Sequence, residues 1–151
     1  MNVYEAKRQQ LIEDTKIPYL NVANIVPEII EKRHVRFVMP VKEMHMNHVN
    51  IVYAGSFFVL AESAGASLIF SAYAEDTNGY TPIISNVTID YLKPATTDLV
   101  VDMTMTEEEA KEKIAKIDER GKGRYPLDVP VHDMEGNHCA TAHITYYLYK
   151  K

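Results

Sequence analysis

The chain has 151 residues, 46% of them hydrophobic and 25% charged, which is the size and composition of one ordinary globular domain. A net charge of −5, and a most basic run (residues 116–124) that mixes both signs, argue against nucleic-acid binding, which requires clustered Lys and Arg. A single cysteine, Cys139, and an N-terminus without an apolar segment indicate a cytoplasmic protein without disulfides, folded as one domain over residues 1–151.

The N-terminal part of the chain shows a weak helical pattern followed by a clearer strand pattern. Residues 1–30 predict one or two short helices, interrupted at Pro18 and Pro27, that pack on the surface of the domain. From His34 to Val41 the alternation of side chains predicts a strand. One face of this strand is formed by Val35, Phe37 and Met39.

The most distinctive segment is the apolar run Ala54–Tyr73, which follows a loop over residues 42–52. Its length and lack of alternation predict a helix of about 30 Å. Because it is apolar on nearly every side, we expect protein to enclose it. Its carboxylate, Glu62, would be costly at the centre of a bilayer, so we expect a core helix and no membrane partner. Asn78 and Gly79 are the turn signal that ends it.

The rest of the chain alternates in the manner of β-strands. The predicted strands cover residues 83–92, 99–106, 125–131 and 139–149, with a hairpin turn at 133–137. In the first of them, one face is formed by Ile83, Ser85, Val87, Ile89 and Tyr91. Thr106 and Glu109 fit a capping box that opens a short helix through Ile117. Pro126 and Pro130 indicate that their strand lies at an edge of the sheet.

This order of elements predicts an α+β fold. A helix that is apolar on every side must be covered on most sides. One antiparallel sheet of about five to six strands, wrapped around the long central helix, provides that cover, and a partner's matching surface closes the rest. Another α+β sandwich is the alternative that the pattern leaves open.

Glu62 is the most informative residue of the predicted helix. Burying an ionised carboxylate without a partner is very costly, so such residues are rare inside apolar helices. One turn further along the helix, Gly65 and Ala66 are small and leave space for a substrate or water beside the carboxylate. The alternative is a glutamate that faces solvent or pairs with a buried arginine.

Three separated pieces of sequence occur together around this residue. Asn47, Gly55 and Leu60-Ala61-Glu62 lie in the loop and helix, and Ile89–Ala95 and Asp133–Gly136 follow in the strand region. With these spacings, the chain from Val35 to Tyr149 resembles the phenylacetate-degradation (PaaI-like) branch of the hot-dog-fold thioesterases. The resemblance implies the hot-dog fold and hydrolysis of an acyl-CoA or related thioester to a free acid and a thiol.

The resemblance also implies roles for four residues. The backbone amide of Ala54, with Gly55 as a second donor, would polarise the thioester carbonyl at the helix start. The Asn47 side chain would hold the carbonyl or the loop. Glu62 would act as a general base on water or as a nucleophile, and the choice stays open.

The sequence departs from the family pattern at three positions. Tyr53 stands where the family often has His, Ala54 replaces the first Gly of a pair, and Asn50 replaces a usual Gly in the turn. An amide donor survives each change. The departures leave the substrate class open and raise the question of whether activity is retained.

Helix geometry constrains this mechanism independently of the resemblance. Ala54 and Glu62 are eight residues apart, about 12 Å along one helix and about 80° around it. The amide donor and the attacking group must both come within about 3 Å of one carbonyl group. One rigid helix cannot satisfy both conditions, whereas two antiparallel copies can. We therefore expect a homodimer with two shared sites, and whether dimers pair into tetramers stays open.

Further residues are expected to contact the substrate. They are Tyr53, Ser63, Ala66, Ser67 and Lys93. Ser63 and Ser67 would orient water, and the alternative for both is packing under the sheet. Lys93, with Arg124 or Lys122, would meet CoA phosphates at the mouth of the site, and solvated surface charge is the alternative for each of them. His45 and His48 lack further ligands at metal-site spacing, so we expect no metal, and no cofactor apart from the CoA of the substrate.

Two other functions compete with hydrolysis. A non-catalytic acyl-CoA-binding module, serving as a sensor or accessory subunit, is favoured by Tyr53 and Asn50. A dehydratase would use a histidine together with a carboxylate, and Tyr53 occupies the place at the helix start where such a histidine would stand.

Overall fold

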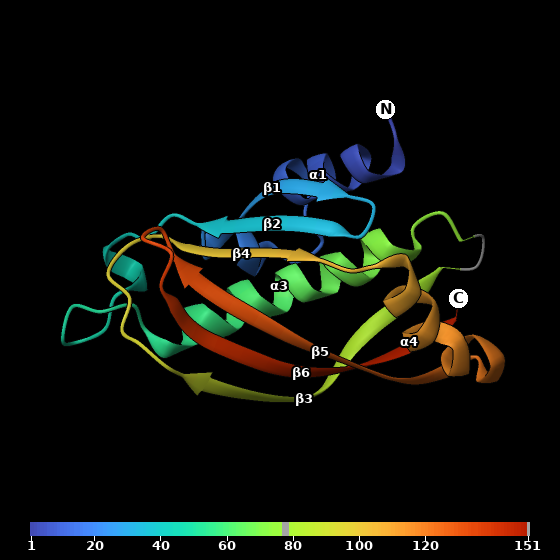
Figure 1. Ribbon diagram of the computed structural model, residues 1–151. Helices are drawn as coiled ribbons and strands as arrows, with labels where there is room; N and C mark the ends of the chain where they lie inside the picture. Colours follow the sequence, from blue (N-terminus) through green and yellow to red (C-terminus); the bar gives the residue numbers. More distant parts are fainter. Residues whose placement is uncertain (77–78, 151) are drawn as a thin grey trace.

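The computed structural model describes residues 1–76 and 79–150, in which one six-stranded antiparallel sheet curves around a long helix (Figure 1). The strand order is β1-β2-β4-β5-β6-β3. The helices are α1 (Val3–Glu13), α2 (Pro18–Val22), the short 3-10 turn η1 (Glu43–His45), α3 (Ala54–Tyr73) and α4 (Glu107–Arg120). The strands are β1 (Val26–Glu31), β2 (His34–Met39), β3 (Tyr80–Tyr91), β4 (Leu99–Thr104), β5 (Lys122–Asp133) and β6 (His138–Lys150). The predicted α+β hot-dog architecture is confirmed.

Helix α3 has the predicted bounds and forms the centre of the core. It is long and apolar enough to cross a membrane, with a mean hydropathy of 1.4, but most of it is buried inside the protein and it is a core helix. One stripe of α3 remains accessible in the single chain. The stripe consists of Phe58, Glu62, Ala66 and Phe70, spaced one turn apart. The expectation that this chain alone surrounds most of the helix therefore holds, except along one side.

The sheet turns an apolar face toward α3. The predicted face of β2, formed by Val35, Phe37 and Met39, is confirmed as the inward one. The buried side chains include Val35, Phe37 and Met39 on β2, Leu99 and Val101 on β4, Tyr125, Leu127, Val129 and Val131 on β5, and Ile144, Tyr146 and Leu148 on β6. Period-two alternation was sufficient because these strands have one covered and one open face.

β5 was predicted to lie at an edge of the sheet, and this is wrong for its place in the strand order. The reason for the prediction still holds, because the prolines of β5 lie where it lacks a strand neighbour on one side. β5 lies between β4 and β6, but β4 pairs with it only where Leu99 meets Asp133 and Val100 meets His132. Along the rest of its length β5 has a strand on one side only. Pro126 and Pro130 lie in that part, where no ladder partner requires an N–H group.

Two other strands differ from the prediction. β1 was missed, because residues 1–30 were expected to be helical, and it holds Pro27 at the outer edge of the sheet beside a register shift. In β3, a register shift between Ile84 and Asn86 makes the predicted face wrong before the shift, where Ile84 packs against the core and Ile83 is exposed. After the shift, Val87 and Ile89 of the predicted face do pack against the core. The predicted turn residue Asn78 lies outside the described residues.

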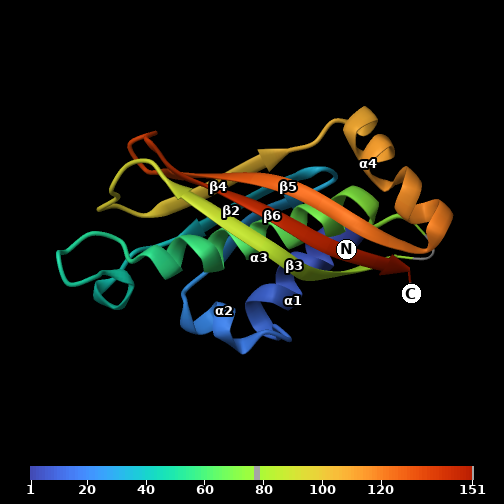
Figure 2. The ribbon, with the colours of Figure 1, turned by 90° about the horizontal axis from the view of Figure 1, so that it is seen from below.

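The N-terminal helices pack on the domain as expected, on the side of α3 that the sheet leaves open (Figure 2). The Arg8 side chain donates to the carbonyls of Pro27 at 2.9 Å and Glu28 at 3.0 Å, which ties α1 to β1. Helix α4 begins at the predicted cap, where the Glu109 amide donates to the Thr106 hydroxyl at 3.0 Å. It runs past Ile117 and ends at Gly121, whose φ of 81° is the left-handed conformation of a helix C-terminus.

Gly65 allows β6 to approach α3 closely. A Cβ atom at this position would lie 2.5 Å from the Tyr146 hydroxyl, which donates to the Glu62 carbonyl at 2.8 Å. We expect Gly65→Ala to destabilise the protein by about 1–3 kcal/mol, because the ring must move and a buried hydrogen bond is lost. Urea denaturation measures this. In the Tyr146→Phe background the same substitution should cost less, and an equal cost in both backgrounds would contradict the assigned contact.

Candidate functional site

The Glu62 side chain lies in a hollow of about 350 Å³, named here the carboxylate hollow. It is bounded by α3, the N-terminal helices and the start of β3. The lining residues include Lys7, Leu11, Ile17, Leu20, Ser63, Ala66, Ser67, Phe70, Thr81 and Pro82. Within residues 1–76 and 79–150, no side chain pairs with the Glu62 carboxylate, and burial alone raises its pKa.

The backbone of Glu62 is fixed from the sheet side. Its carbonyl accepts the hydrogen bond from the Tyr146 hydroxyl, and burial raises the pKa of Tyr146 well above its ordinary value, so this hydroxyl keeps its proton. The sequence indicated Tyr146 only as a strand residue, because its contact with Glu62 depends on how closely β6 approaches α3. The carboxylate therefore projects from a rigid point of the helix into the hollow.

Three predicted substrate contacts share the carboxylate hollow with Glu62. Ser63 is buried, and its hydroxyl donates to the Leu60 carbonyl at 3.0 Å, which leaves its oxygen available as an acceptor. Ser67 is also buried, and its hydroxyl has no hydrogen-bond partner in the part of the chain that the structure describes. Ala66 lines the hollow one turn beyond Glu62. Both serines are thus placed where water beside the carboxylate would lie.

The start of α3 presents backbone amides without acceptors. Its N-terminal cap residue, Tyr53, provides no side-chain cap, and its own amide donates to the His45 carbonyl at 2.8 Å. Among the described residues, none accepts a hydrogen bond from the amide of Ala54 or of Gly55. These free N–H groups and the helix dipole make this end of α3 electropositive, as an oxyanion donor must be.

A second hollow of about 340 Å³, the amide hollow, lies at this helix start. It contains Asn47, Ala54, Tyr91 and Lys93. Lys93 is exposed, and its Nζ donates to the Asn137 side chain at 2.8 Å. The lysine is therefore held near the hollow with one donor already engaged.

The Asn47 side chain organises the loop before α3. Its Oδ1 accepts hydrogen bonds from the amides of Val49 at 2.9 Å and Ile51 at 3.3 Å. Asn47 was expected to hold either the thioester carbonyl or the loop, and these two hydrogen bonds support the second role. Asn50 has a φ of 60°, a conformation that Gly and Asn adopt most readily. Asn50 can therefore replace the family's usual Gly without changing the turn.

Tyr91, which was not predicted as a site residue, fixes the first turn of α3. Its hydroxyl donates to the Ala54 carbonyl at 2.8 Å, and its ring meets the Phe57 ring edge-on with centroids 5.5 Å apart. No sequence signal distinguished it from the other tyrosines of the strands. The end of β3 thus holds the peptide that follows the Ala54 amide.

Tyr53 lies at the outer side of the helix start. It is 57% exposed, and a Cβ on Gly55 would come within 2.6 Å of its ring. Gly55 therefore lets the ring lie close to the backbone. Both residues line a third hollow, of about 360 Å³, which extends toward α2 and Met44.

The candidate residues lie in three hollows of one chain, with Tyr53 and Gly55 in the third. Glu62 with Ser63, Ala66 and Ser67 occupies the carboxylate hollow, whereas Asn47, Ala54 and Lys93 line the amide hollow. The structure therefore keeps the predicted base and donor apart within a single α3. In residues 1–76 and 79–150, no three His, Cys, Asp or Glu side chains gather in a way that would hold a metal ion.

Comparisons with known proteins agree with this fold. A family model described as a domain of unknown function (DUF4442) matches residues 7–148. A Pseudomonas aeruginosa structure, described as a protein of unknown function and probable thioesterase, is 27% identical, with a TM-score of 0.85 over 100% of this chain and 99% of the other. No curated protein matches the chain.

Two more distant structures share the fold. A Haemophilus influenzae thioesterase is 14% identical, with a TM-score of 0.71 over 99% of this chain and 92% of that one. A hypothetical thioesterase from Streptococcus pneumoniae, solved with coenzyme A, is 17% identical, with a TM-score of 0.61 over 85% of this chain and 88% of the other. The matching family model does not test the phenylacetate-degradation branch, which stays a prediction.

The pKa shift of Glu62 predicts a pH-dependent effect on stability. Because burial raises the pKa, the folded protein prefers the protonated acid, and its contribution is complete below the ordinary pKa and lost as pH rises through the raised value. Glu62→Gln should therefore raise the melting temperature at pH 8 but not at pH 4. Thermal unfolding at both pH values measures this, with Glu108→Gln on the exposed start of α4 as the control. Equal shifts at both pH values would contradict it.

Proposed function

The chain belongs to the DUF4442 family. From the hot-dog fold and the geometry of α3 we propose that it is a thioesterase that hydrolyses acyl-CoA or a related acyl thioester. The observation that carries the proposal is the unpaired carboxylate of Glu62 in the carboxylate hollow. Even partial burial of a carboxylate without a structural partner is costly, and the raised pKa makes Glu62 a better base near neutral pH. Thioesterase descriptions among structures of this fold, one of them with coenzyme A, support the same reading.

In the proposed reaction, Glu62 removes a proton from water that adds to the thioester carbonyl, or its oxygen attacks that carbonyl directly. The C–S bond then breaks, and the thiolate leaves and takes up a proton. In the second route, water hydrolyses the resulting anhydride. Both routes give one carboxylic acid and one thiol and need no other reactant. Ser63 and Ser67 would orient the water.

The developing negative charge on the carbonyl oxygen requires hydrogen-bond donors. The free amides of Ala54 and Gly55 are the donors that α3 offers. Since they lie about 12 Å from Glu62 along the same helix, we propose that each site combines Glu62 of one subunit with the amides of its partner in a homodimer.

Two features support such a dimer. β3 ends the sheet, so its outer side has no strand neighbour among the described residues. Three of the four residues of the accessible stripe (Glu62, Ala66 and Phe70) line the same hollow as Tyr80, Thr81 and Pro82 of β3. Joining two sheets at β3 would bring the two stripes together in antiparallel orientation, which is the arrangement that the chemistry needs.

The alternative is a module that binds acyl thioesters without cleaving them. It rested on Tyr53 and Asn50, and Asn50 adopts the backbone conformation of the residue it replaces. Only Tyr53 still favours this reading. Membership of the phenylacetate-degradation branch and a cytoplasmic location are part of the same proposal. Substrate profiling and cellular localisation test them, and substrate profiling also identifies the acyl group.

Replacing the proposed base tests the reaction. Glu62→Gln should lower kcat for acyl-CoA hydrolysis by about 10²–10⁴-fold, because the amide cannot accept the proton from water. Steady-state release of free thiol, across acyl-CoAs of several chain lengths and an aryl-CoA, measures this. Glu108→Gln is the matched control and should leave kcat unchanged. Tight binding of acyl-CoA by the wild type without any thiol release would favour the binding module.

Shared sites are tested by complementation between two inactive subunits. Ala54→Pro removes one amide donor at the first helical position, where proline is well tolerated, and should cost about 10²–10³-fold. Heterodimers of Ala54→Pro and Glu62→Gln, isolated with two affinity tags, contain one site with an intact Glu62 and an intact Ala54 amide. They should recover about half of wild-type activity. Heterodimers as inactive as both parents would show that the site is not shared.

A further inference from the structure

A hollow of about 410 Å³ lies on the outer side of the sheet, between α4 and the adjoining strands β5 and β6. We name it the basic hollow. Its lining includes Lys113, Lys116, Arg120, Lys122, Arg124 and Tyr147. The single acidic residue of its lining is Glu112. Five cations thus surround one concave surface in a chain whose net charge is −5.

Most of these cations have no partner. Of the residues that the structure describes, none pairs with the side chains of Lys116, Arg120, Lys122 and Arg124. Neighbouring charges are paired: Lys111 lies 3.3 Å from Glu107, and Lys150 lies 2.6 Å from Asp118. Like charges repel one another, and a bound anion would relieve that repulsion in this hollow.

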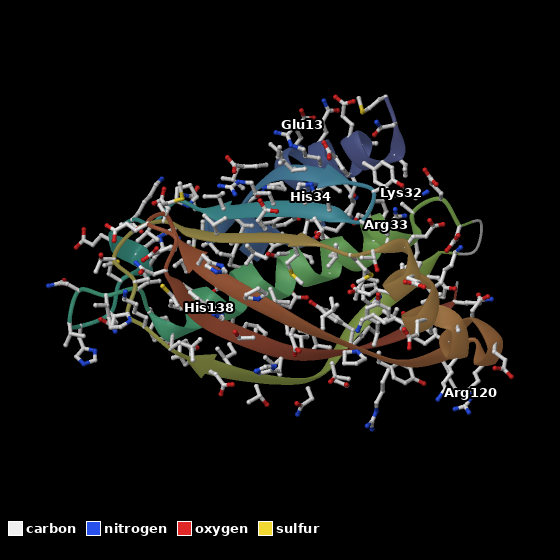
Figure 3. All side chains as sticks on the ribbon, in the orientation of Figure 1. Glu13, Lys32, Arg33, His34, Arg120 and His138 are labelled. Atoms are coloured by element: carbon white, nitrogen blue, oxygen red, sulfur yellow. The ribbon has the colours of Figure 1, made fainter. Side chains whose placement is uncertain are left out.

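The fold creates this cluster from a run of mixed charges. Asp118 accepts hydrogen bonds from Lys150 at 2.6 Å and from the Tyr80 hydroxyl at 2.8 Å, so its carboxylate is engaged away from the hollow. Lys116 and Arg120 are one turn apart and therefore share a face of α4. Arg120 lies at the end of α4, far from the start of α3 (Figure 3).

The floor of the basic hollow is rigid, whereas its rim is free to adapt. The Lys113 ammonium donates to the Pro126 carbonyl at 2.7 Å and lies 5.2 Å from the Tyr125 ring centroid. Gly123 permits close packing, since a Cβ there would lie 3.0 Å from Ile117. Arg120 and Arg124 on the rim are exposed, and guanidinium groups bind phosphates with two parallel hydrogen bonds.

Strand register connects the basic hollow to the carboxylate hollow. Arg124 on β5 pairs with Tyr147 on β6, which pairs with Ile83 on β3. These positions span two strand spacings, about 10 Å. The next residue of β3, Pro82, lines the carboxylate hollow. A ligand that leaves this hollow past residues 80–82, before the part of β3 at which a partner strand would pair, would therefore reach Tyr147 and Arg124 on the outer side of the sheet.

We propose that the basic hollow binds the nucleotide end of coenzyme A, with the cations on its phosphates and the Tyr147 ring against the adenine. This inference rests on the proposed function. A volume of about 410 Å³ suits a small molecule. Several phosphates on one nucleoside match several cations around one aromatic side chain.

The test compares two thioesters of the same acyl group, one on CoA and one on pantetheine, which lacks the nucleotide. Arg124→Ala should raise KM about tenfold for the CoA thioester, the effect of one lost charged hydrogen bond, while kcat stays unchanged. KM for the pantetheine thioester should not move. Lys111→Ala, which removes one exposed cation of α4 outside the hollow, is the control and should change neither substrate.

A binding experiment decides the inference even if no thioester is hydrolysed. Adenosine 3′,5′-bisphosphate should bind the wild-type protein in calorimetric titration, and Arg124→Ala should weaken that binding about tenfold while Lys111→Ala does not. Absence of binding to the wild type would overturn the proposal. So would equal KM changes for both thioesters, or an effect of Arg124→Ala confined to a thioester on an acidic carrier protein.

Discussion

The approach of β6 to α3 at Gly65 is the contact on which the position of the Glu62 carboxylate depends. Without a Cβ at Gly65, the Tyr146 hydroxyl reaches the Glu62 carbonyl, and the helix is held against the sheet at this residue. The buried tyrosine has a raised pKa, so it remains a donor over the whole physiological range. A carboxylate on a helix fixed in this way cannot withdraw from its apolar surroundings, and its own pKa rises in consequence.

The same rigidity separates the two halves of the proposed chemistry. Tyr91 fixes the first turn of α3 from the other end of the sheet, so neither the amide of Ala54 nor Glu62 can move toward the other. A short loop bearing both groups would have allowed a site within one chain. A straight, buried helix of 20 residues does not, and this constraint favours sites assembled by two copies.

The sequence was sufficient wherever a pattern depends on neighbours along the chain. The apolar run predicted the bounds of α3, and alternation identified the inward face of β2. The prediction failed where a contact between residues distant in the sequence determines the structure. β1 was missed because Pro27 was read as a helix break, and the register shift after Ile84 made the predicted face of β3 wrong before the shift and right after it. The hydrogen bonds of Tyr91 and Tyr146 depend on tertiary approach. The sequence indicated Arg124 and Lys122 as candidates for CoA phosphates, but it grouped them with Lys93, which lines a different hollow, and the mixed charges around Asp118 concealed the cluster on α4.

The borders of the sheet are protected unequally, and this bears on self-association. At β1, Pro27 removes one amide donor, and Arg8 occupies the carbonyls of Pro27 and Glu28. Along the unpaired part of β5, two prolines remove donors, and Lys113 occupies the Pro126 carbonyl. β3 has one proline near its start, Pro82, and none from Ile83 to Tyr91. Uncontrolled strand addition, the first step of β-aggregation, is thus discouraged at two borders, which leaves the third as the place where another copy can dock in register.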